Sequence, residues 1–397
     1  MMKSRPSLLR NFASRTALVA GLLASACAPS SADSTPPETV QSRTDEPAVA
    51  SLKDAFAQHF LVGAALPANI FSEEDKASAE LVKAQFNRIT AENETKWRGV
   101  HGEPDEFSFE TSDKFVEFGK RNEMEIHGHV LVWHTDQPDW IFQGEGGQPA
   151  TREQLLDRLK EHIATVAGRY KGSIAYWDVV NEAFEDDGTM RKSPWYTIIG
   201  EDYIEQAFIA AAAAAPDAKL VYNDYNLWMP AKRDATVALV KKLQSKNIRI
   251  DAVGMQGHYR TAGDPTLAQV EEAILAYKGA GVQVLFSELD VDPLPFAWDR
   301  LGADVNFSVE LREELDPYHE GFPAEAEEAQ AQRYADLFRL FVKHSDVIES
   351  VTFWGVHDGM SWLNTWPVKG RTNYPLLFDR QLRPKKAWYA IMQVAAE

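Results

Sequence analysis

Apolar runs alternate with amphipathic stretches from about Ser51 to the end of the chain. Eight apolar runs have the length and composition of buried strands, and they lie near Phe60–Leu66, Asn87–Ala91, Glu125–His134, Ile174–Asn181, Lys219–Asn223, Ala252–Gly257, Gln283–Leu289 and Ser350–Gly355. Helical periodicity separates them, over Glu73–Phe86, Lys114–Arg121, Arg152–Arg169, Tyr203–Ala215, Ala235–Lys246, Leu267–Ala280, Glu325–Val342 and a stretch after Pro384. This alternation predicts parallel βα units. Eight units favour an α/β fold of the (β/α)8 TIM barrel type over a doubly wound sheet, which rarely needs so many.

Residues 1–26 have the features of an export signal. The segment begins with several basic residues and no acidic residue. The run Ala17–Ala26 that follows is apolar and too short to span a bilayer. The run ends Ala24-Ser25-Ala26-Cys27, which fits an ordinary signal-peptidase site and also resembles a bacterial lipoprotein box with Cys27 as the lipidated residue. We therefore expect an exported protein that is periplasmic, anchored to the outer membrane through a lipid on Cys27, or extracellular.

Residues 27–50 are rich in Ser, Thr, Pro, Asp and Glu and show no apolar period, so we expect a disordered linker. The barrel domain then covers residues 51–397. One connection inside it, Val291–Pro323, is long, and such loops in compact domains are usually functional or mobile.

The formal net charge of the 397-residue chain is −18, from 59 acidic and 41 basic residues. The chain has no cluster of Lys and Arg of the kind that binds phosphates, so we expect no nucleic-acid partner. Cys27 is the only cysteine, which leaves no intrachain disulfide. An acidic enzyme that acts as a monomer on a neutral or uronate-poor polymer fits this composition.

Two apolar strands each deliver a glutamate at their carboxyl end: Ala175-Tyr-Trp-Asp-Val-Val-Asn-Glu182 and Val284-Leu-Phe-Ser-Glu288-Leu-Asp290. In a TIM barrel that end carries the active site. Burying two carboxylates is costly unless their charges are used. Glycoside hydrolysis uses such a pair, in which the ionised nucleophile raises the pKa of the neighbouring acid. A glutamate at a strand end can instead cap the next helix.

Neighbouring residues suggest how the two glutamates differ. Asn181 can offer an amide to a sugar hydroxyl beside Glu182, which suits the acid/base side. Asp290 lies on the same face of its strand as Glu288, where it could orient His258 against the nucleophile.

The motifs Trp177-Asp-Val-Val-Asn-Glu-Ala183 and Ser287-Glu-Leu-Asp290 resemble the acid/base and nucleophile motifs of glycoside hydrolase family 10, the retaining xylanases. The stretch from Gly281 to Val291 is similar to the nucleophile signature throughout. This resemblance implies a TIM barrel, a metal-free retaining reaction without a cofactor, and xylan and xylo-oligosaccharides as substrates. It also implies that Glu182 is the acid/base and Glu288 the nucleophile.

The same resemblance implies roles for residues at other strand ends. Glu92, Asn93 and Lys96 would bond sugar hydroxyls on the non-reducing side, and the other cleft residues would be His129, Trp133, Gln256, Trp354 and Trp362, with His134 in the supporting shell. From the residues alone, Glu92 and Lys96 could form a salt bridge, the His127-x-His129 pattern could be half of a metal site, and each tryptophan could be core packing.

One position departs from the family pattern: Asp136 stands where the family commonly has Gln, which adds charge and removes a donor on the non-reducing side. We therefore expect substrate recognition there, rather than the chemistry, to differ. Three alternative functions remain open at this point: a β-glucanase or exo-acting xylosidase of the same architecture, a non-catalytic surface glycan-binding protein, and a metal-dependent hydrolase.

Overall fold

The computed structural model describes residues 51–297 and 308–397. The predicted signal segment 1–26, Cys27, the predicted linker 27–50 and residues 298–307 of the long connection lie outside the described residues, and their predictions stay untested. No helix in the described part of the chain is long and apolar enough to cross a membrane.

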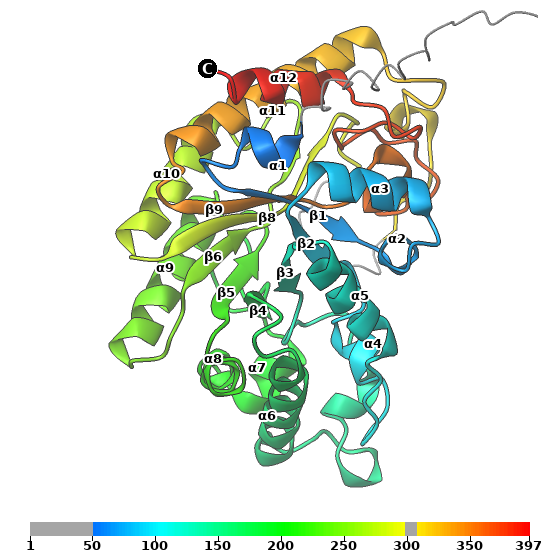
Figure 1. Cartoon of the computed structure of the whole chain (residues 1–397). Coiled ribbons are helices and arrows are strands. Elements are labelled where there is room, and N and C mark those ends of the chain that lie inside the picture. The colour runs from blue at the N-terminus through cyan, green and yellow to red at the C-terminus, as the bar shows by residue number, and fades with distance from the viewer. Residues whose placement is uncertain (1–50, 298–307) are drawn as a thin grey trace, which may run out of the picture. The chain divides into compact units, whose positions relative to one another are not determined.

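Eight parallel strands close into a barrel, which confirms the predicted fold (Figure 1). The strands are β1 Leu61–Leu66, β2 Arg88–Ala91, β3 Glu125–Gly128, β4 Tyr176–Asn181, β5 Lys219–Asp224, β6 Ala252–Met255, β8 Gln283–Asp292 and β9 Ile348–Phe353. Each pairs with the next in this order, β6 pairs with β8, and β9 pairs with β1. A further short strand, β7 His258–Arg260, continues the direction of β6 and pairs with the carboxyl end of β8.

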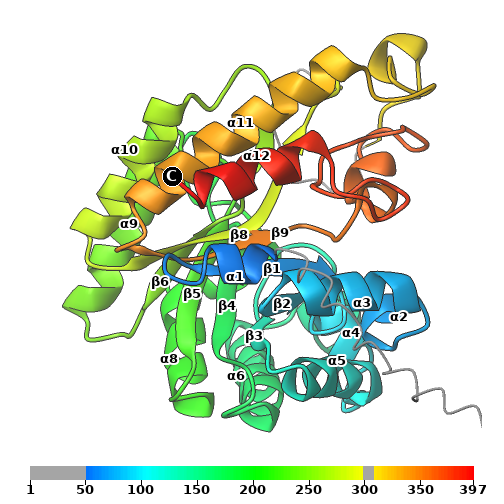
Figure 2. The same ribbon diagram turned by 45° about the horizontal axis from the view of Figure 1, so that its top comes forward.

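Helices surround the barrel (Figures 1 and 2). The longer ones are α3 Lys76–Gln85, α5 Glu110–Arg121, α6 Arg152–Arg169, α8 Tyr203–Ala214, α9 Pro230–Ser245, α10 Leu267–Gly279, α11 Ala324–Lys343 and α12 Lys386–Val394. Short helices are α1 Leu52–Ala55, α2 Ala68–Phe71, α4 Trp97–Val100 and α7 Pro194–Ile199, and 3-10 turns cover Asp139–Phe142, Glu145–Gly147, Glu313–Leu315, Asp358–Met360 and Trp362–Asn364. Capping boxes at Thr151 and Thr266 fix where α6 and α10 begin, because each threonine satisfies a free backbone N–H.

The two largest differences from the predicted boundaries concern β3 and α9. Strand β3 ends at Gly128 instead of near His134, since the chain beyond it keeps only scattered contacts with β4, such as the bond from Leu131 N to the carbonyl of Asp178. Helix α9 begins at Pro230 instead of Ala235, because proline is well tolerated in the first turn of a helix.

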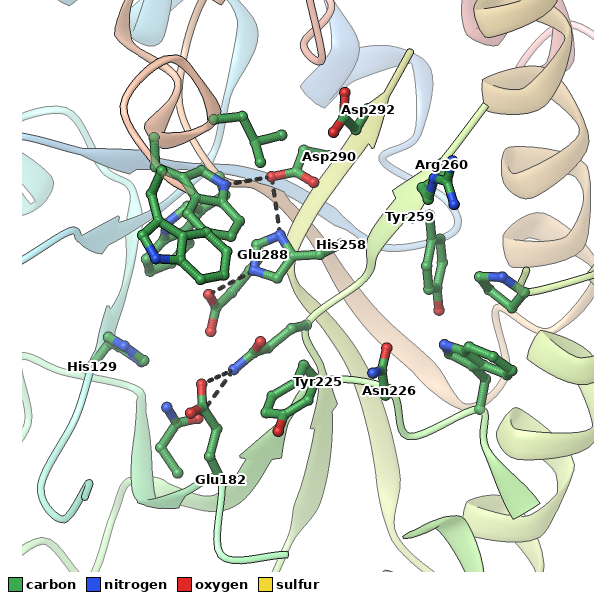
Figure 3. A pocket seen from close by; sticks show the side chains of 18 of the residues that line it. His129, Glu182, Tyr225, Asn226, His258, Tyr259, Arg260, Glu288, Asp290 and Asp292 are labelled. Atoms are coloured by element: carbon green, nitrogen blue, oxygen red, sulfur yellow. Dashed lines mark hydrogen bonds and ion pairs between the residues drawn. The ribbon is translucent and has the colours of Figure 1, made fainter. Parts of the chain in front are cut away.

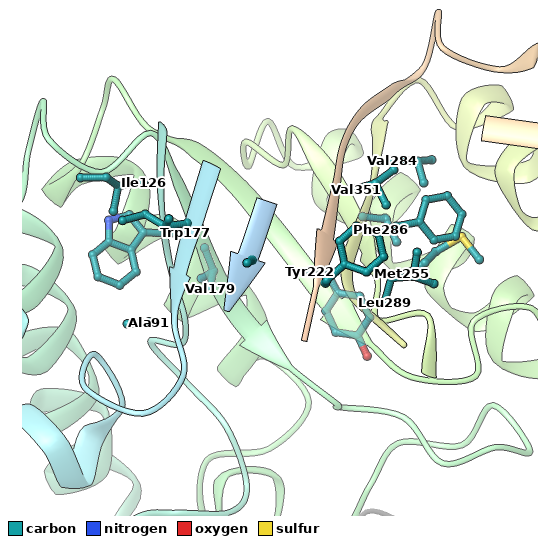
Figure 4. Packing of buried hydrophobic residues seen from close by; sticks show 14 of the residues in the cluster. Ala91, Ile126, Trp177, Val179, Tyr222, Met255, Val284, Phe286, Leu289 and Val351 are labelled. Carbon is teal, nitrogen blue, oxygen red and sulfur yellow. The ribbon is translucent and has the colours of Figure 1, made fainter. Parts of the chain in front are cut away.

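The main hydrophobic core fills the layer between the strands and the helices (Figure 4). Phe286 of β8, for example, packs on Phe341 of α11 with ring centroids 4.0 Å apart. The interior of the barrel is polar in part: Arg88 bonds to His127 at 2.7 Å, and His127 bonds to Asp178 at 2.9 Å. These strands therefore pack apolar residues outward and carry hydrogen-bonding groups inward.

Strand β4 is irregular shortly before Glu182, and β8 is irregular around Glu288. The register of β4 against β5 shifts between Asp178 and Val180, and that of β8 against β9 shifts between Phe286 and Leu289. Such irregularities bend a strand and change where the following side chains point.

Candidate active site

The carboxyl ends of the strands surround a cleft with a volume of about 700 Å³. Glu182 follows β4 directly and Glu288 lies within β8, and both side chains line this cleft (Figure 3). Both are nearly buried, with 6% and 5% of their surface exposed. The structure thus brings together the two glutamates that sequence analysis selects.

A chain of amide groups connects the two carboxylates. Gln256 Nε2 donates to Glu182 Oε1 at 2.9 Å, and Asn223 Nδ2 donates to Glu288 Oε1 at 2.8 Å. Both amide nitrogens also approach Asn181 Oδ1, at 3.4 Å and 2.9 Å. The positions of the two carboxylates are therefore coupled through β4, β5 and β6.

On the side of Glu288, a histidine lies between two acidic groups (Figure 3). His258 Nε2 is 3.3 Å from Glu288 Oε2, and His258 Nδ1 is 3.0 Å from Asp290 Oδ2. Trp362 Nε1 donates to the same oxygen of Asp290 at 2.9 Å. Burial lowers the pKa of His258, but the two carboxylates outweigh burial and raise it to about 10. His258 is therefore a cation at neutral pH, placed between Glu288 and Asp290.

The surroundings of Glu182 are different. Trp133 Nε1 donates to Glu182 Oε2 at 2.9 Å, and His134 Nδ1 lies 3.9 Å from that oxygen. Burial raises the pKa of Glu182, but the charge of His134 and the hydrogen bonds from Gln256 and Trp133 lower it by more, so the net shift is downward. The expectation of a raised pKa for Glu182 is wrong for this arrangement, because these interactions favour the ionised carboxyl.

Glu92, Asn93 and Lys96 follow β2 and line one end of the cleft. Lys96 Nζ donates to Asn93 Oδ1 at 2.9 Å and lies over the ring of Trp133, 5.1 Å from its centroid. Burial raises the pKa of Glu92, which keeps its carboxyl closer to neutrality than an exposed one. These three residues offer the mixture of donors and acceptors that binds hydroxyl groups.

The histidines of the His-x-His pattern both bond to one carboxylate. Asp178 accepts from His127 at 2.9 Å and from His129 at 2.8 Å. His129 lines the cleft with its ring edge-to-face against Trp354, at a centroid distance of 5.4 Å. No group of three or more His, Cys, Asp or Glu side chains within residues 51–297 and 308–397 is arranged to hold a metal ion.

Trp354 and Trp362 both line the cleft, and Trp362 stacks on Trp366 with ring centroids 5.0 Å apart.

Asp136 is not among the residues lining the cleft, and its carboxylate accepts from Arg98 at 3.2 Å. Any effect of Asp136 on substrate recognition would therefore be indirect.

Sequence reasoning did not select several residues that the structure places at the site. These are Asn223, which bonds to Glu288, and the cleft residues Tyr225, Asn226, Trp228, Tyr259, Arg260, Phe296 and Trp366. The sequence does carry a signal for Asn223, Tyr225 and Asn226, because Asn223 lies at the carboxyl end of β5 and the other two follow that strand directly. Trp228, Phe296 and Trp366 lie in connecting segments, where no strand pattern indicates the direction of a side chain.

Comparison with known proteins gives one consistent result. The model of the family described as "Glycosyl hydrolase family 10" matches residues 51–394. The chain is 45% identical to the Endo-1,4-beta-xylanase A of Xylanibacter ruminicola over 84% of this chain and 90% of that protein. It is 41% identical to the Beta-1,4-xylanase of Dictyoglomus thermophilum over 87% of this chain and 91% of that protein.

Comparison with solved structures also gives xylanases. A GH10 endoxylanase from a sugarcane soil metagenome superposes with a TM-score of 0.82 at 43% identity, over 87% of this chain and 99% of that one. A xylanase of Paenibacillus barcinonensis, solved with a conduramine derivative, gives a TM-score of 0.78 at 38% identity, over 88% and 99% of the two chains.

The charge of His134 beside Glu182 leads to a prediction. Replacing His134 with Gln removes a positive charge that stabilises the ionised carboxyl, so the pKa of Glu182 should rise. Carbon-13 NMR titration of the glutamate carboxyls measures this change, and His319→Gln, which alters an exposed histidine outside the cleft, is the matched control. An unchanged Glu182 titration in the His134 variant would contradict the assignment.

Proposed function

The chain belongs to glycosyl hydrolase family 10, and from this membership we propose that it is an endo-1,4-β-xylanase that retains the anomeric configuration. The observation that carries the proposal is the pair Glu182 and Glu288 in one cleft, held in place through Gln256, Asn181 and Asn223. Each carboxylate has a different set of partners, as two carboxylates with two different roles require.

The proposed reaction is a double displacement. Glu288 attacks the anomeric carbon and forms a covalent glycosyl-enzyme, while Glu182 gives its proton to the departing sugar oxygen. Glu182 then removes a proton from water, which attacks the same carbon and releases the product with net retention. This mechanism requires a separation of about 5–5.5 Å between the two carboxyl groups.

The lowered pKa of Glu182 favours its ionised form, but the proposed reaction needs this carboxyl to carry a proton when the bond is cut. A sugar chain in the cleft displaces water from the half of the site that Trp133 and Glu182 share. Desolvation disfavours the ionised carboxyl, so the pKa of Glu182 rises when substrate binds. We therefore propose that the acid is protonated in the enzyme–substrate complex.

The position of the pair within the cleft supports cleavage inside a chain. Glu92, Asn93 and Lys96 lie at the end of β2, whereas Tyr225 and Trp228 follow β5. Binding groups therefore lie on both sides of the two glutamates, and sugars can occupy both sides of the bond that is cut. A pocket closed on one side would instead release single terminal sugars.

The main test compares wild type with Glu288→Ala on purified xylan, with the products resolved by length. Wild type should release a series of xylo-oligosaccharides, and Glu288→Ala should lose this activity by about 10⁴-fold or more, because no covalent intermediate can form. Glu161→Ala on the exposed face of α6 is the matched control.

Proton NMR of the first products reports the anomeric configuration, and inverted products would refute the double displacement. Activity assays on cellulose and mannan under the same conditions distinguish a xylanase from a β-glucanase. If single xylose units alone were released, an exo-acting enzyme would replace this proposal.

The role of Glu182 gives a separate prediction. Glu182→Ala removes the proton donor, which a good leaving group hardly needs. The first step on an activated aryl xylobioside should therefore persist while hydrolysis of xylan falls by roughly 10²–10⁴-fold. Burst kinetics with the aryl substrate measure that step, and an equal loss on both substrates would assign Glu182 another role.

We also propose that the protein is exported and carries a lipid on Cys27. The basic residues before the apolar run Ala17–Ala26 and the single cysteine directly after it support this proposal. In a bacterial host, wild type should label with a radioactive fatty acid and sediment with membranes, and Cys27→Ser should do neither. If wild type is exported but is soluble and carries no label, the lipid proposal is refuted and the protein is simply secreted.

A further inference from the structure

Arg260 is a cleft residue for which the proposed reaction has no use. It ends β7, and side chains alternate along a strand, so Arg260 points to the same side as His258, two residues earlier. At about 3.3 Å per residue, its backbone lies roughly 7 Å farther from the reaction centre than that of His258. A group on a neighbouring sugar, rather than on the sugar being attacked, is therefore within its reach.

Arg260 is half-buried, and no carboxylate within residues 51–297 and 308–397 bonds to its guanidinium. Within these residues its guanidinium makes one ring contact, with Phe296, whose centroid is 5.0 Å away. The nearest acidic residue along the sheet is Asp292, whose Cα pairs in register with that of Arg260. Asp292 accepts hydrogen bonds instead from Asn373 at 2.9 Å and from the backbone of Leu294 at 2.8 Å.

The charges around the cleft make this arginine unusual. In the described part of the chain, the acidic residues that line the cleft are Glu92, Glu182, Asp264, Glu288, Asp290 and Asp292, and the only Lys and Arg side chains there are Lys96 and Arg260. Lys96 is bonded to Asn93. A partly desolvated guanidinium without an acceptor is costly, whereas a bound anion would satisfy several of its five donors.

The position of Arg260 in the barrel indicates which side of the cleft it faces. Strand β2, which precedes Glu92 and Lys96, lies opposite β6 in the order of the closed barrel, and β7 continues from β6. Figure 3 shows Arg260 on the same side as Tyr225 and Asn226, away from His129. Because the family resemblance assigns Glu92 and Lys96 to the non-reducing side of the cut, Arg260 on the opposite side faces the part of the substrate that leaves with the departing sugar.

We propose that Arg260 binds the carboxylate of an acidic side group on the xylan chain, one that is attached on the leaving side of the bond that is cut. The inference rests on the proposed function and adds a substrate class to it: sparsely carboxylated xylan. The negative net charge of the protein disfavours dense polyanions, but a single carboxylate beside Arg260 forms a local ion pair. Phe296 holds the guanidinium plane in place from one side, which leaves its N–H edge for the ligand.

The test uses one xylo-oligosaccharide with a glucuronic acid branch and the same compound with that carboxyl reduced to the alcohol. The measured quantity is the ratio of kcat/KM for the acid over the reduced compound. Arg260→Gln should lower this ratio roughly three- to tenfold, in line with the loss of one part-exposed charged hydrogen bond. Arg260→Lys keeps the charge without the planar fork and should give an intermediate ratio.

Two controls separate the local effect from a general one. Arg233→Gln removes the same charge from α9, where the half-buried Arg233 pairs with Asp234 and Glu272, and should leave the ratio at the wild-type value. Raising the salt from about 0.01 M to about 1 M shortens the screening length from roughly 30 Å to 3 Å and should lower the ratio in wild type but not in Arg260→Gln.

A ratio in Arg260→Gln equal to that of wild type would overturn the inference, as would equal losses on the acid and reduced compounds. Either result would leave the proposed function intact as long as wild type cleaves unbranched xylan. Failure of wild type on unbranched xylan would instead refute the proposed function, and this inference with it.

Discussion

The site depends on a hydrogen-bonded chain of neutral amides between two buried carboxylates. Gln256 holds Glu182, Asn223 holds Glu288, and both contact the same oxygen of Asn181. Burying a carboxylate without donors would cost several kcal/mol, and each charge-assisted hydrogen bond offsets about 1.5–3 kcal/mol. Because the members come from four strands, the closure of the barrel itself determines the relative position of the two acids.

The surroundings then make the two carboxylates different. His258 carries a positive charge because Asp290 and Glu288 raise its pKa to about 10, and Trp362 holds Asp290 in place. This cation lies against Glu288, the proposed nucleophile. For Glu182, burial raises the pKa, and the charge of His134 together with the hydrogen bonds from Gln256 and Trp133 lowers it by more. Substrate that enters the cleft can shift that balance by removing water.

Irregular strand geometry makes this arrangement possible. Strict alternation would place Ser287 and Glu288 on opposite faces of β8, yet Ser287 Oγ and Glu288 both bond to the side chain of Asn223. The register shift between Phe286 and Leu289 allows both contacts. Glu182 has a φ of 57°, a left-handed conformation that costs a non-glycine residue about 1–2 kcal/mol and is found at functional sites.

The sequence by itself determined the barrel and the strand ends at which Glu182 and Glu288 lie, because periodicity and burial are local properties of each run of residues. It also placed Asp290 on the same face as Glu288, since alternation along a strand needs no tertiary information. It could not determine that Asn223 donates to Glu288, that His134 lowers the pKa of Glu182, or that no carboxylate in the described part of the chain bonds to Arg260. Those facts depend on distances between strands far apart in the chain and on register shifts that no local pattern reveals, so only the closed barrel decided them.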